Sequence, residues 1–250
     1  MSDRPLAWVP GYTMTTAIWG ELWENLPGIR HVGIDLPGHG QESATAMPSS
    51  LTGWAEHVAH RMAEAGSRDL VGLSFGSSIA LQVALEFPDQ VDRLILAAPT
   101  LSGRTDDNAA RNKYIELAKA LFRGVSGRPL ADIWMAAPPD IFTGLRQHPA
   151  RFERLAQMVA THSFAELRTG SMATLAQTSQ TTDQLAGLRA EVLVLSGSHD
   201  MPLFRENAEL IAAHAPQAFM TELPAVGHLP LLEEPEACAA HLEGFLSVHV

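Results

Sequence analysis

The feature that most constrains this chain is an alternation of short apolar runs with stretches of helical spacing. The apolar runs are LAWV (6–9), HVGID (31–35), DLVGL (69–73), VDRLILAA (91–98), AEVLVLSG (190–197) and AFMTEL (218–223). Helical spacing recurs between them, as in the stretch 51–62 that follows Ser50. Strands that alternate with helices form parallel βαβ units with right-handed crossovers. We therefore predict an α/β fold with a mainly parallel six-stranded sheet flanked by helices.

The alternation is interrupted between residues 99 and 187, where no strand pattern is evident and helical pieces are separated by GVSGRP and AAPPD. We predict that this segment is a helical cap or lid inserted after the fourth strand, and that 1–98 and 188–250 form the core. The segment holds ten Lys and Arg against eight Asp and Glu, whereas the rest of the chain holds seven against twenty. A slightly basic lid would suit an anionic substrate or an acidic carrier, although solvated surface charge is the simpler interpretation.

Composition excludes several classes of protein. The 250 residues are 46% hydrophobic and 18% charged, which is enough apolar side chain for one sizeable core. The net charge of −11 argues against a nucleic-acid partner, because proteins that bind nucleic acids are usually basic. No run is long and apolar enough to span a membrane, and the start lacks the pattern of a secretory signal. The single cysteine, Cys238, cannot form an internal disulfide and is expected to be a buried thiol of a cytoplasmic protein.

The motif GLSFG follows the apolar run DLVGL and opens a helical stretch. Gly72 and Gly76 lack a Cβ atom where a tight turn would bring strand and helix together, and such a turn exposes the hydroxyl of Ser74 in a strained conformation. The start of the helix then directs backbone N–H groups toward a developing oxyanion. Alone, the motif is also compatible with an ordinary glycine-rich bend, so its context has to decide.

A serine hydroxyl needs a base, and the base needs a carboxylate that orients it. In this kind of turn the chain order is serine, acid, histidine. His228 lies in the loop after the last predicted strand, and Asp200 lies just past the carboxyl end of the strand before it. Loops at the carboxyl ends of parallel strands form the ligand sites of α/β proteins. We therefore predict Ser74 as nucleophile, His228 as base and Asp200 as acid.

The assignment of the acid remains open at this point. Asp200 is also well placed to cap the helix that follows it, and Asp106 and Asp107 are the alternative acids. His199, next to Asp200, is more simply interpreted as a turn residue. The sequence contains no H-E-x-x-H, no cysteine cluster and no G-x-G-x-x-G, so we expect no metal ion and no dinucleotide or other cofactor.

Taken together, these motifs resemble the α/β-hydrolase family, in its lidded, single-domain serine esterase form. The matching stretches are VPGYTMTTAIW, DLPGHGQES, GLSFG, LVLSGSHD and VGHLPLLEEPEA, which run almost from end to end of the chain. The resemblance implies the same Ser74, Asp200 and His228 triad, with an oxyanion hole formed by the backbone N–H groups of Tyr12 and Phe75. The lid has no match specific enough to indicate a subfamily.

The chain departs from the family pattern in two places. Pro10 stands before Gly11 where the family usually has histidine, which leaves open how the loop that carries Tyr12 is held. The chain also starts at the first central strand, so we expect no antiparallel edge hairpin and a different strand at that edge of the sheet.

The activity expected from this resemblance is hydrolysis of a carboxylic ester through an acyl-enzyme. The substrate is predicted to be a small or acyl-chain hydrophobic ester in a pocket lined by Tyr12, Met14, Trp134, Phe142 and Leu229. A second interpretation is a thioesterase, or an esterase acting on acyl groups bound to a carrier or to CoA, in which lid residues would contact an acidic carrier. These lid residues are Arg111, Lys113, Lys119 and Arg123. A C–C hydrolase, a lyase or a cofactor-free cyclase with the same triad is a third interpretation, and a non-catalytic receptor is a fourth. The sequence does not indicate the oligomeric state.

Overall fold

Six strands form the central sheet. A computed structural model describes residues 4–104, 108–169 and 178–247. The strands are β1 (Leu6–Val9), β2 (His31–Gly33), β3 (Asp69–Leu73), β4 (Arg93–Ala97), β5 (Glu191–Gly197) and β6 (Ala218–Leu223). They lie in the order β2-β1-β3-β4-β5-β6, with β2 at one edge, and each neighbouring pair is parallel. The predicted six-stranded parallel sheet is confirmed.

The central strands β1, β3 and β4 consist entirely of buried residues. Helices cover both faces of the sheet, which is why these strands are nearly continuous apolar runs rather than alternating ones. The register sets Val9 beside Gly72 and Leu73 beside Ala97. The residues that follow β1, β3 and β4 therefore lie close together, at the carboxyl ends of these neighbouring strands.

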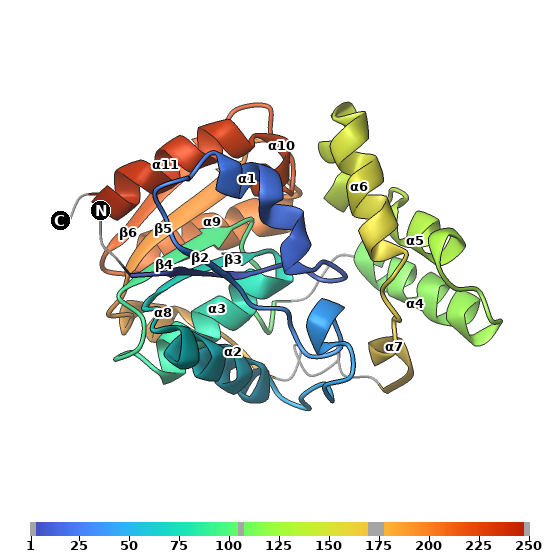
Figure 1. The fold of residues 1–250 in the computed structure, drawn as a ribbon, viewed down its shortest axis with the longest axis horizontal. Helices are drawn as coiled ribbons and strands as arrows, with labels where there is room; N and C mark the ends of the chain where they lie inside the picture. Colours follow the sequence, from blue (N-terminus) through green and yellow to red (C-terminus); the bar gives the residue numbers. More distant parts are fainter. Residues whose placement is uncertain (1–3, 105–107, 170–177, 248–250) are drawn as a thin grey trace.

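Two pairs of helices cover the faces of the sheet. Helices α2 (Leu51–Ala65) and α3 (Phe75–Glu86) pack together on one face, and α1 (Gly20–Glu24) and α11 (Pro235–Ser247) lie on the other (Figure 1). The Ser50 hydroxyl caps α2 by accepting a hydrogen bond from the Gly53 N–H at 3.1 Å. Helix α3 is buried along nearly its whole length, which fits a sequence made mainly of apolar and small residues.

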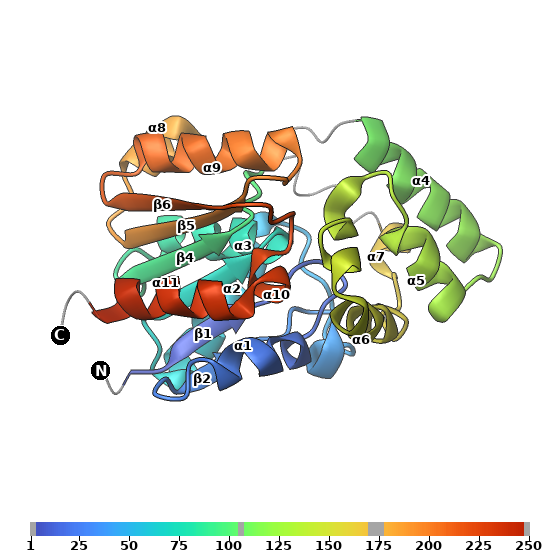
Figure 2. The same cartoon turned by 90° about the horizontal axis from the view of Figure 1, so that it is seen from above.

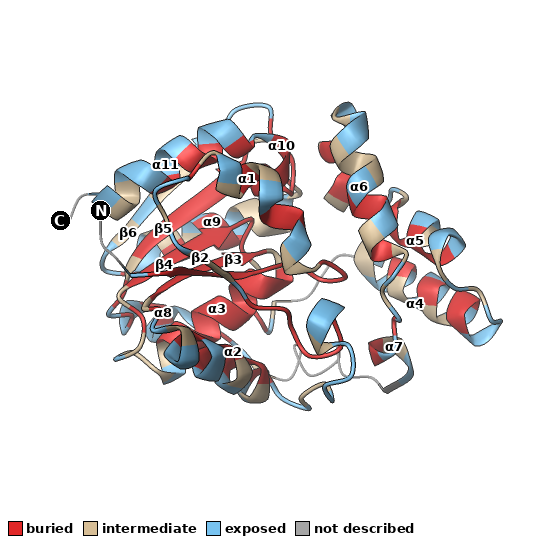
Figure 3. Ribbon diagram, in the orientation of Figure 1, coloured by how far each residue is buried: buried red, intermediate tan, exposed pale blue. Residues whose placement is uncertain are grey.

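Four helices gather beyond the carboxyl ends of the strands, at the right of Figures 1 and 2. They are α4 (Asn108–Phe122), α5 (Arg128–Met135), α6 (Pro149–Val159) and α7 (Glu166–Thr169). They belong to the segment 99–187, for which the sequence predicts a lid, and α4, α5 and α6 each have a buried and an exposed side (Figure 3). Helix α8 (Thr182–Ala186), the last of that segment, packs instead on α9 (Pro202–His214) beside the sheet.

Three elements are shorter than their sequence patterns predict. Strand β4 spans Arg93–Ala97 rather than 91–98. The helical spacing over 17–26 becomes a 3-10 turn, Thr16–Trp19, followed by α1, with Gly20 at the junction. Strand β2 ends at Gly33, and the carboxylate of Asp35 beyond it accepts hydrogen bonds from two backbone N–H groups, at 2.7 and 2.9 Å. Over the described residues, no helix combines the length and apolar character needed to cross a membrane.

Candidate active site

The turn between β3 and α3 holds Ser74 in an unusual conformation. Its φ of 52° and ψ of −119° lie in a region that L-residues rarely adopt. A Cβ atom on Gly72 would lie 2.5 Å from the Gly76 carbonyl oxygen, and one on Gly76 would lie 2.4 Å from the Pro10 carbonyl oxygen. Neither position has room for a side chain, so the two glycines permit the turn that presents Ser74 at the sheet edge.

Ser74, His228 and Asp200 lie in one chain of hydrogen bonds. The Ser74 Oγ is 2.8 Å from the His228 Nε2, and the His228 Nδ1 is 2.9 Å from the Asp200 Oδ1. A carboxylate only accepts hydrogen bonds, so Nδ1 carries the proton and Nε2 is free to accept the proton of Ser74. His228 is 1% exposed and Asp200 6% exposed, whereas Ser74 is only partly buried. The arrangement can take a proton from a serine hydroxyl that solvent and substrate reach.

The loops that carry Asp200 and His228 touch each other. A Cβ atom on Gly197, at the end of β5, would lie 2.2 Å from the Gly227 carbonyl oxygen. The backbone N–H of Met201 donates to the Asp200 Oδ1 at 2.7 Å, so this carboxylate oxygen serves both the turn and the histidine. Asp200 thus makes a local backbone contact in addition to the contact with His228.

Glu233 is a residue that the sequence reasoning missed. It lies in the short helix α10 (Pro230–Glu233) and is 2% exposed. Its carboxylate accepts hydrogen bonds from the backbone N–H groups of Gly227 at 2.7 Å and Leu229 at 2.9 Å, on either side of His228. Hydrogen bonds to an ionised group are roughly twice as strong as neutral ones. Glu233 therefore holds the histidine loop in place, and the only signal for it in the sequence is an acidic residue one short helix after the histidine.

The other described candidates from the sequence take no part in this chain of hydrogen bonds. Asp106 and Asp107 lie outside the described residues. His199 is exposed, and its backbone N–H donates to the Val226 carbonyl at 2.8 Å, as expected of a turn residue. Cys238 is fully buried in α11, where burial raises the pKa of its thiol to about 12. In the described ranges, no group of three or more His, Cys, Asp or Glu side chains is arranged to hold a metal ion.

The loop after β1 reaches the same edge of the sheet. Thr13 has a φ of 65°, and the Met14 N–H donates to the Gly11 carbonyl at 3.1 Å, so the loop is a tight turn. Among the described residues, none accepts a hydrogen bond from the backbone N–H of Tyr12 or of Phe75. Both groups are therefore available to a ligand.

Side chains from three helices hold the loop 11–15. The Trp134 Nε1–H of α5 donates to the Thr13 Oγ1 at 3.0 Å, and the Tyr12 hydroxyl donates to the Glu166 carboxylate of α7. The Thr15 N–H approaches the Met158 sulfur of α6 at 3.2 Å. These contacts hold the loop that has proline where the family usually has histidine. They join segments far apart in the sequence, and no local pattern indicated them.

A buried polar cluster lies behind this loop. The His39 Nε2 accepts a hydrogen bond from the Thr13 N–H at 3.4 Å, and its Nδ1 lies 3.1 Å from the Pro37 carbonyl, an arrangement that requires a neutral imidazole. The His39 ring lies 4.5 Å from the His162 ring, whose Nε2 is 3.0 Å from the Glu166 Oε1. Burial, and then the neighbouring His162, lower the pKa of His39 to about 4.

The same cluster sets the charge state of the groups around Tyr12. Burial and the Glu166 carboxylate raise the pKa of the Tyr12 hydroxyl well above its usual value, so this group remains a donor. Burial alone would raise the pKa of Glu166. Its hydrogen bond and charge interaction with His162, and the hydrogen bond from Tyr12, together lower this pKa below its usual value. Tyr12 therefore donates to an ionised carboxylate, which makes this tie a strong one.

Stability should fall as His39 is forced to accept a proton. Its pKa of about 4 lies below the ordinary 6.5, so the unfolded chain binds more protons between these values and the free energy of unfolding decreases as pH falls through them. We expect a loss of roughly 2–3 kcal/mol from this residue between pH 7 and pH 4.5, measured by urea unfolding. His39→Gln should remove that part of the pH dependence. The control His60→Gln, at an exposed position of α2, should retain it, and equal pH dependence in all three proteins would contradict the assignment.

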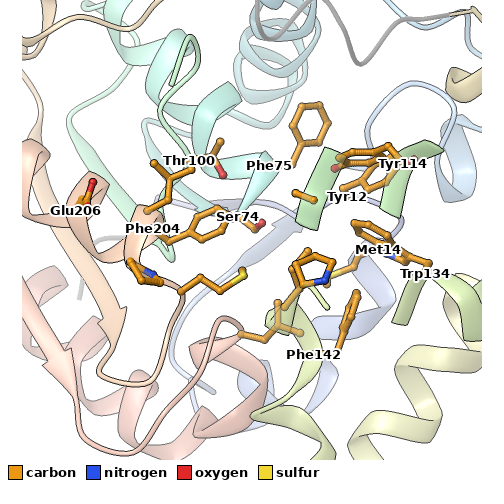
Figure 4. Close-up of a pocket in the computed structure, with 17 residues that line it drawn as sticks. Tyr12, Met14, Ser74, Phe75, Thr100, Tyr114, Trp134, Phe142, Phe204 and Glu206 are labelled. Atoms are coloured by element: carbon orange, nitrogen blue, oxygen red, sulfur yellow. The ribbon is translucent and has the colours of Figure 1, made fainter. Parts of the chain in front are cut away.

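A cavity of about 510 Å³ opens above Ser74. Its wall includes Tyr12, Met14, Trp134, Phe142 and Leu229, together with Tyr114, Ile141, Met201 and Phe204 among others. Figure 4 shows Ser74 between Phe204 on one side and the group of Tyr12, Tyr114, Met14 and Trp134 on the other. The Phe204 ring lies 4.2 Å from the His228 ring, a contact that the sequence reasoning missed. The cavity has the size and apolar wall of a small-molecule site.

Known proteins resemble this chain over nearly its whole length. The profile of the alpha/beta hydrolase family matches residues 6–241. A pimeloyl-[acyl-carrier protein] methyl ester esterase of Nitrosomonas europaea is 29% identical over 92% of this chain and 91% of its own. A protein of the same description from Aromatoleum aromaticum is 27% identical over 96% of this chain and 98% of its own. Among solved structures, a thermophilic esterase from Thermogutta terrifontis superposes with a TM-score of 0.80 at 25% identity, over 98% of this chain and 90% of its own.

Proposed function

We propose that this chain, which belongs to the alpha/beta hydrolase family, hydrolyses a carboxylic ester with Ser74 as nucleophile, His228 as base and Asp200 as orienting acid. The observation that carries the proposal is the chain of hydrogen bonds from Ser74, which lines the apolar cavity, through His228 to Asp200. A serine hydroxyl, an oriented imidazole and a buried carboxylate are the parts that acyl transfer requires.

Acylation begins when the Ser74 Oγ attacks the ester carbonyl and the His228 Nε2 takes its proton. The negative charge that develops on the carbonyl oxygen is met by the backbone N–H groups of Tyr12 and Phe75, each worth roughly 3 kcal/mol. Asp200 accepts a hydrogen bond from the imidazolium and stabilises its charge. His228 then gives its proton to the leaving alkoxide, which departs as the alcohol and leaves the acyl group on Ser74.

Deacylation repeats these steps with water. His228 takes a proton from a water molecule that attacks the acyl carbonyl, and the same two N–H groups hold the oxyanion. The proton returns to the Ser74 Oγ as the carboxylic acid leaves, which restores the starting state of all three residues. No other group is needed to balance the protons.

The cavity indicates the kind of ester. Its wall is dominated by apolar and aromatic side chains such as Met14, Trp134 and Phe142, which suit an acyl chain or a small hydrophobic ester. An ester on a carrier-bound acyl chain is a second candidate, because the relatives from Nitrosomonas europaea and Aromatoleum aromaticum are described as esterases of such a substrate. A thioester fits the same chemistry.

A fluorophosphonate probe followed by mass spectrometry tests the mechanism directly. We expect one covalent adduct, on Ser74, and hydrolysis of p-nitrophenyl esters that varies with acyl length because the cavity is finite. Unfolded protein serves as the control and should not react, since the hydroxyl is activated only in the folded site. A folded protein that forms no adduct at Ser74 would contradict the proposal. An adduct without turnover of any ester would favour a lyase, a cyclase or a C–C hydrolase with the same triad.

A further inference from the structure

Helix α4 exposes apolar and basic side chains on one face. Ile115 is 43% exposed and Phe122 is 71% exposed, and they are two of the three large hydrophobic residues that stand out from the described surface. Arg111 and Lys119 are exposed beside them on the same helix, and the exposed Arg123 directly follows its last residue. We call these five residues the α4 face. Aromatic residues and arginine are enriched at protein interfaces relative to the rest of a protein's surface.

The positive charges of the α4 face have no ion-pair partner among the described residues. Within the described part of the chain, no acidic side chain forms an ion pair with Arg111, Lys119 or Arg123. Other arginines of the segment 99–187 do have such partners: Arg104 pairs with Glu206 at 2.8 Å, Arg128 with Glu153 at 2.7 Å and Arg154 with Glu21 at 3.1 Å. Lys113, which the sequence suggested as a carrier contact, is buried and pairs with Glu116 at 3.1 Å, so it does not belong to this surface.

The α4 face adjoins the cavity. Ala110 and Tyr114 of the same helix line the cavity wall, and Tyr114 is seen there in Figure 4. Arg111 and Ile115 each follow one of these residues, so they lie about 100° further around the helix. A macromolecule seated on the α4 face would therefore rest beside the cavity wall that Ala110 and Tyr114 form.

We propose that the α4 face docks an acidic carrier protein that presents its acyl ester to Ser74 on a flexible arm. This docking proposal rests on the ester hydrolysis proposed above, and it specifies which surface of the protein binds a carrier-bound ester. The chain has a net charge of −11, so most of its surface repels an acidic partner, and the α4 face is a local region of attraction beside the cavity. Phe122 and Ile115 would supply the apolar anchor, and the three cations would steer and align the carrier.

The charge of the α4 face argues against a second copy of the chain as the occupant. In a symmetric pair, the same surface meets itself, which would bring two sets of three like charges together. An anionic lipid surface would also be attracted to these cations. A binding assay with anionic vesicles distinguishes that occupant from a carrier protein. The carrier is favoured because it links the α4 face to the adjoining cavity, which has room for an acyl chain.

The test compares one ester in two forms: a dicarboxylic acyl methyl ester on a holo acyl-carrier protein, and the corresponding free dimethyl ester. In the double variant Arg111→Glu and Lys119→Glu, we expect KM for the carrier-bound ester to rise about tenfold or more and kcat/KM for the free ester to stay unchanged. Phe122→Ser should raise the same KM through loss of the anchor. Added salt should weaken binding of the carrier-bound ester in the unmodified enzyme, and less so in the double variant.

Matched controls lie away from the cavity. Arg61→Glu reverses an exposed charge on α2, and Phe219→Ser removes an exposed aromatic ring on β6. Neither should change KM for the carrier-bound ester. Three results would overturn the docking proposal. The first is an equal KM for the α4-face variants and the unmodified enzyme, and the second is an equal loss of activity with both substrates. The third is a loss of self-association or of vesicle binding in the variants while KM for the carrier-bound ester stays unchanged. Turnover of the free ester alone would reject docking and leave ester hydrolysis standing, whereas failure of both substrates together with no adduct on Ser74 would reject ester hydrolysis itself.

Discussion

Ser74→Ala should lower kcat for ester hydrolysis by roughly a million-fold while the protein remains folded. The substitution removes the atom that forms the acyl-enzyme, and the oxyanion donors alone give only a small residual rate. The Ser74 Oγ hydrogen-bonds to His228, and the residue is only partly buried, so its loss removes little packing. Burst and steady-state release of p-nitrophenol measure the effect, and thermal unfolding checks the fold.

This experiment has a clear contrary outcome. A Ser74→Ala protein with an unchanged melting temperature that still turns over the ester within about tenfold of the original rate would remove Ser74 from the mechanism. Intact Asp200 and His228 serve as the internal control, because their hydrogen bond should persist in the variant.

Asp200→Asn should lower kcat by roughly ten thousand-fold. The side-chain amide has nearly the same shape as the carboxylate, but its NH₂ group favours the imidazole tautomer with the proton on Nε2. In that tautomer His228 cannot accept the proton of Ser74. Steady-state kinetics with the free ester measure the loss, and a KM that changes far less than kcat would show that substrate binding survives.

The matched controls for Asp200 are the two alternative acids suggested by the sequence. Asp106→Asn and Asp107→Asn make the same chemical change in residues outside the described structure, and we expect near-normal kcat from both. If one of them lost activity to the extent predicted for Asp200→Asn while Asp200→Asn remained active, the acid would have to be reassigned.

Much of the fold could be predicted because its signals are local. Each parallel strand is a short apolar run with turn residues at its end, and β3 and β5 lie within a residue of their predicted bounds. The proposed triad was also readable, since Ser74, Asp200 and His228 each follow a predicted strand and parallel strands end at one edge of the sheet. Its roles stay a prediction until the variants are measured.

The parts that could not be predicted depend on contacts between distant segments. His39 is far along the chain from His162 and Glu166, which are only four residues apart, and nothing near His39 in the sequence indicates the buried cluster that the three form. Glu233 acts on the backbone around His228 rather than on its side chain, so it has no pattern of its own. The packing of α8 against α9 likewise follows from tertiary contacts and not from helical spacing.

The contacts that hold the loop 11–15 bear on how this enzyme would reject wrong substrates. Three helices reach that loop through Trp134, Met158 and Glu166, so part of its support depends on these helices being seated on it. A molecule too bulky for the helices to settle over it would still occupy the cavity, but it would meet a loosened Tyr12 N–H and a poorly stabilised oxyanion. Such a molecule would be bound but cleaved only slowly, so it would compete with better substrates while showing a depressed kcat of its own.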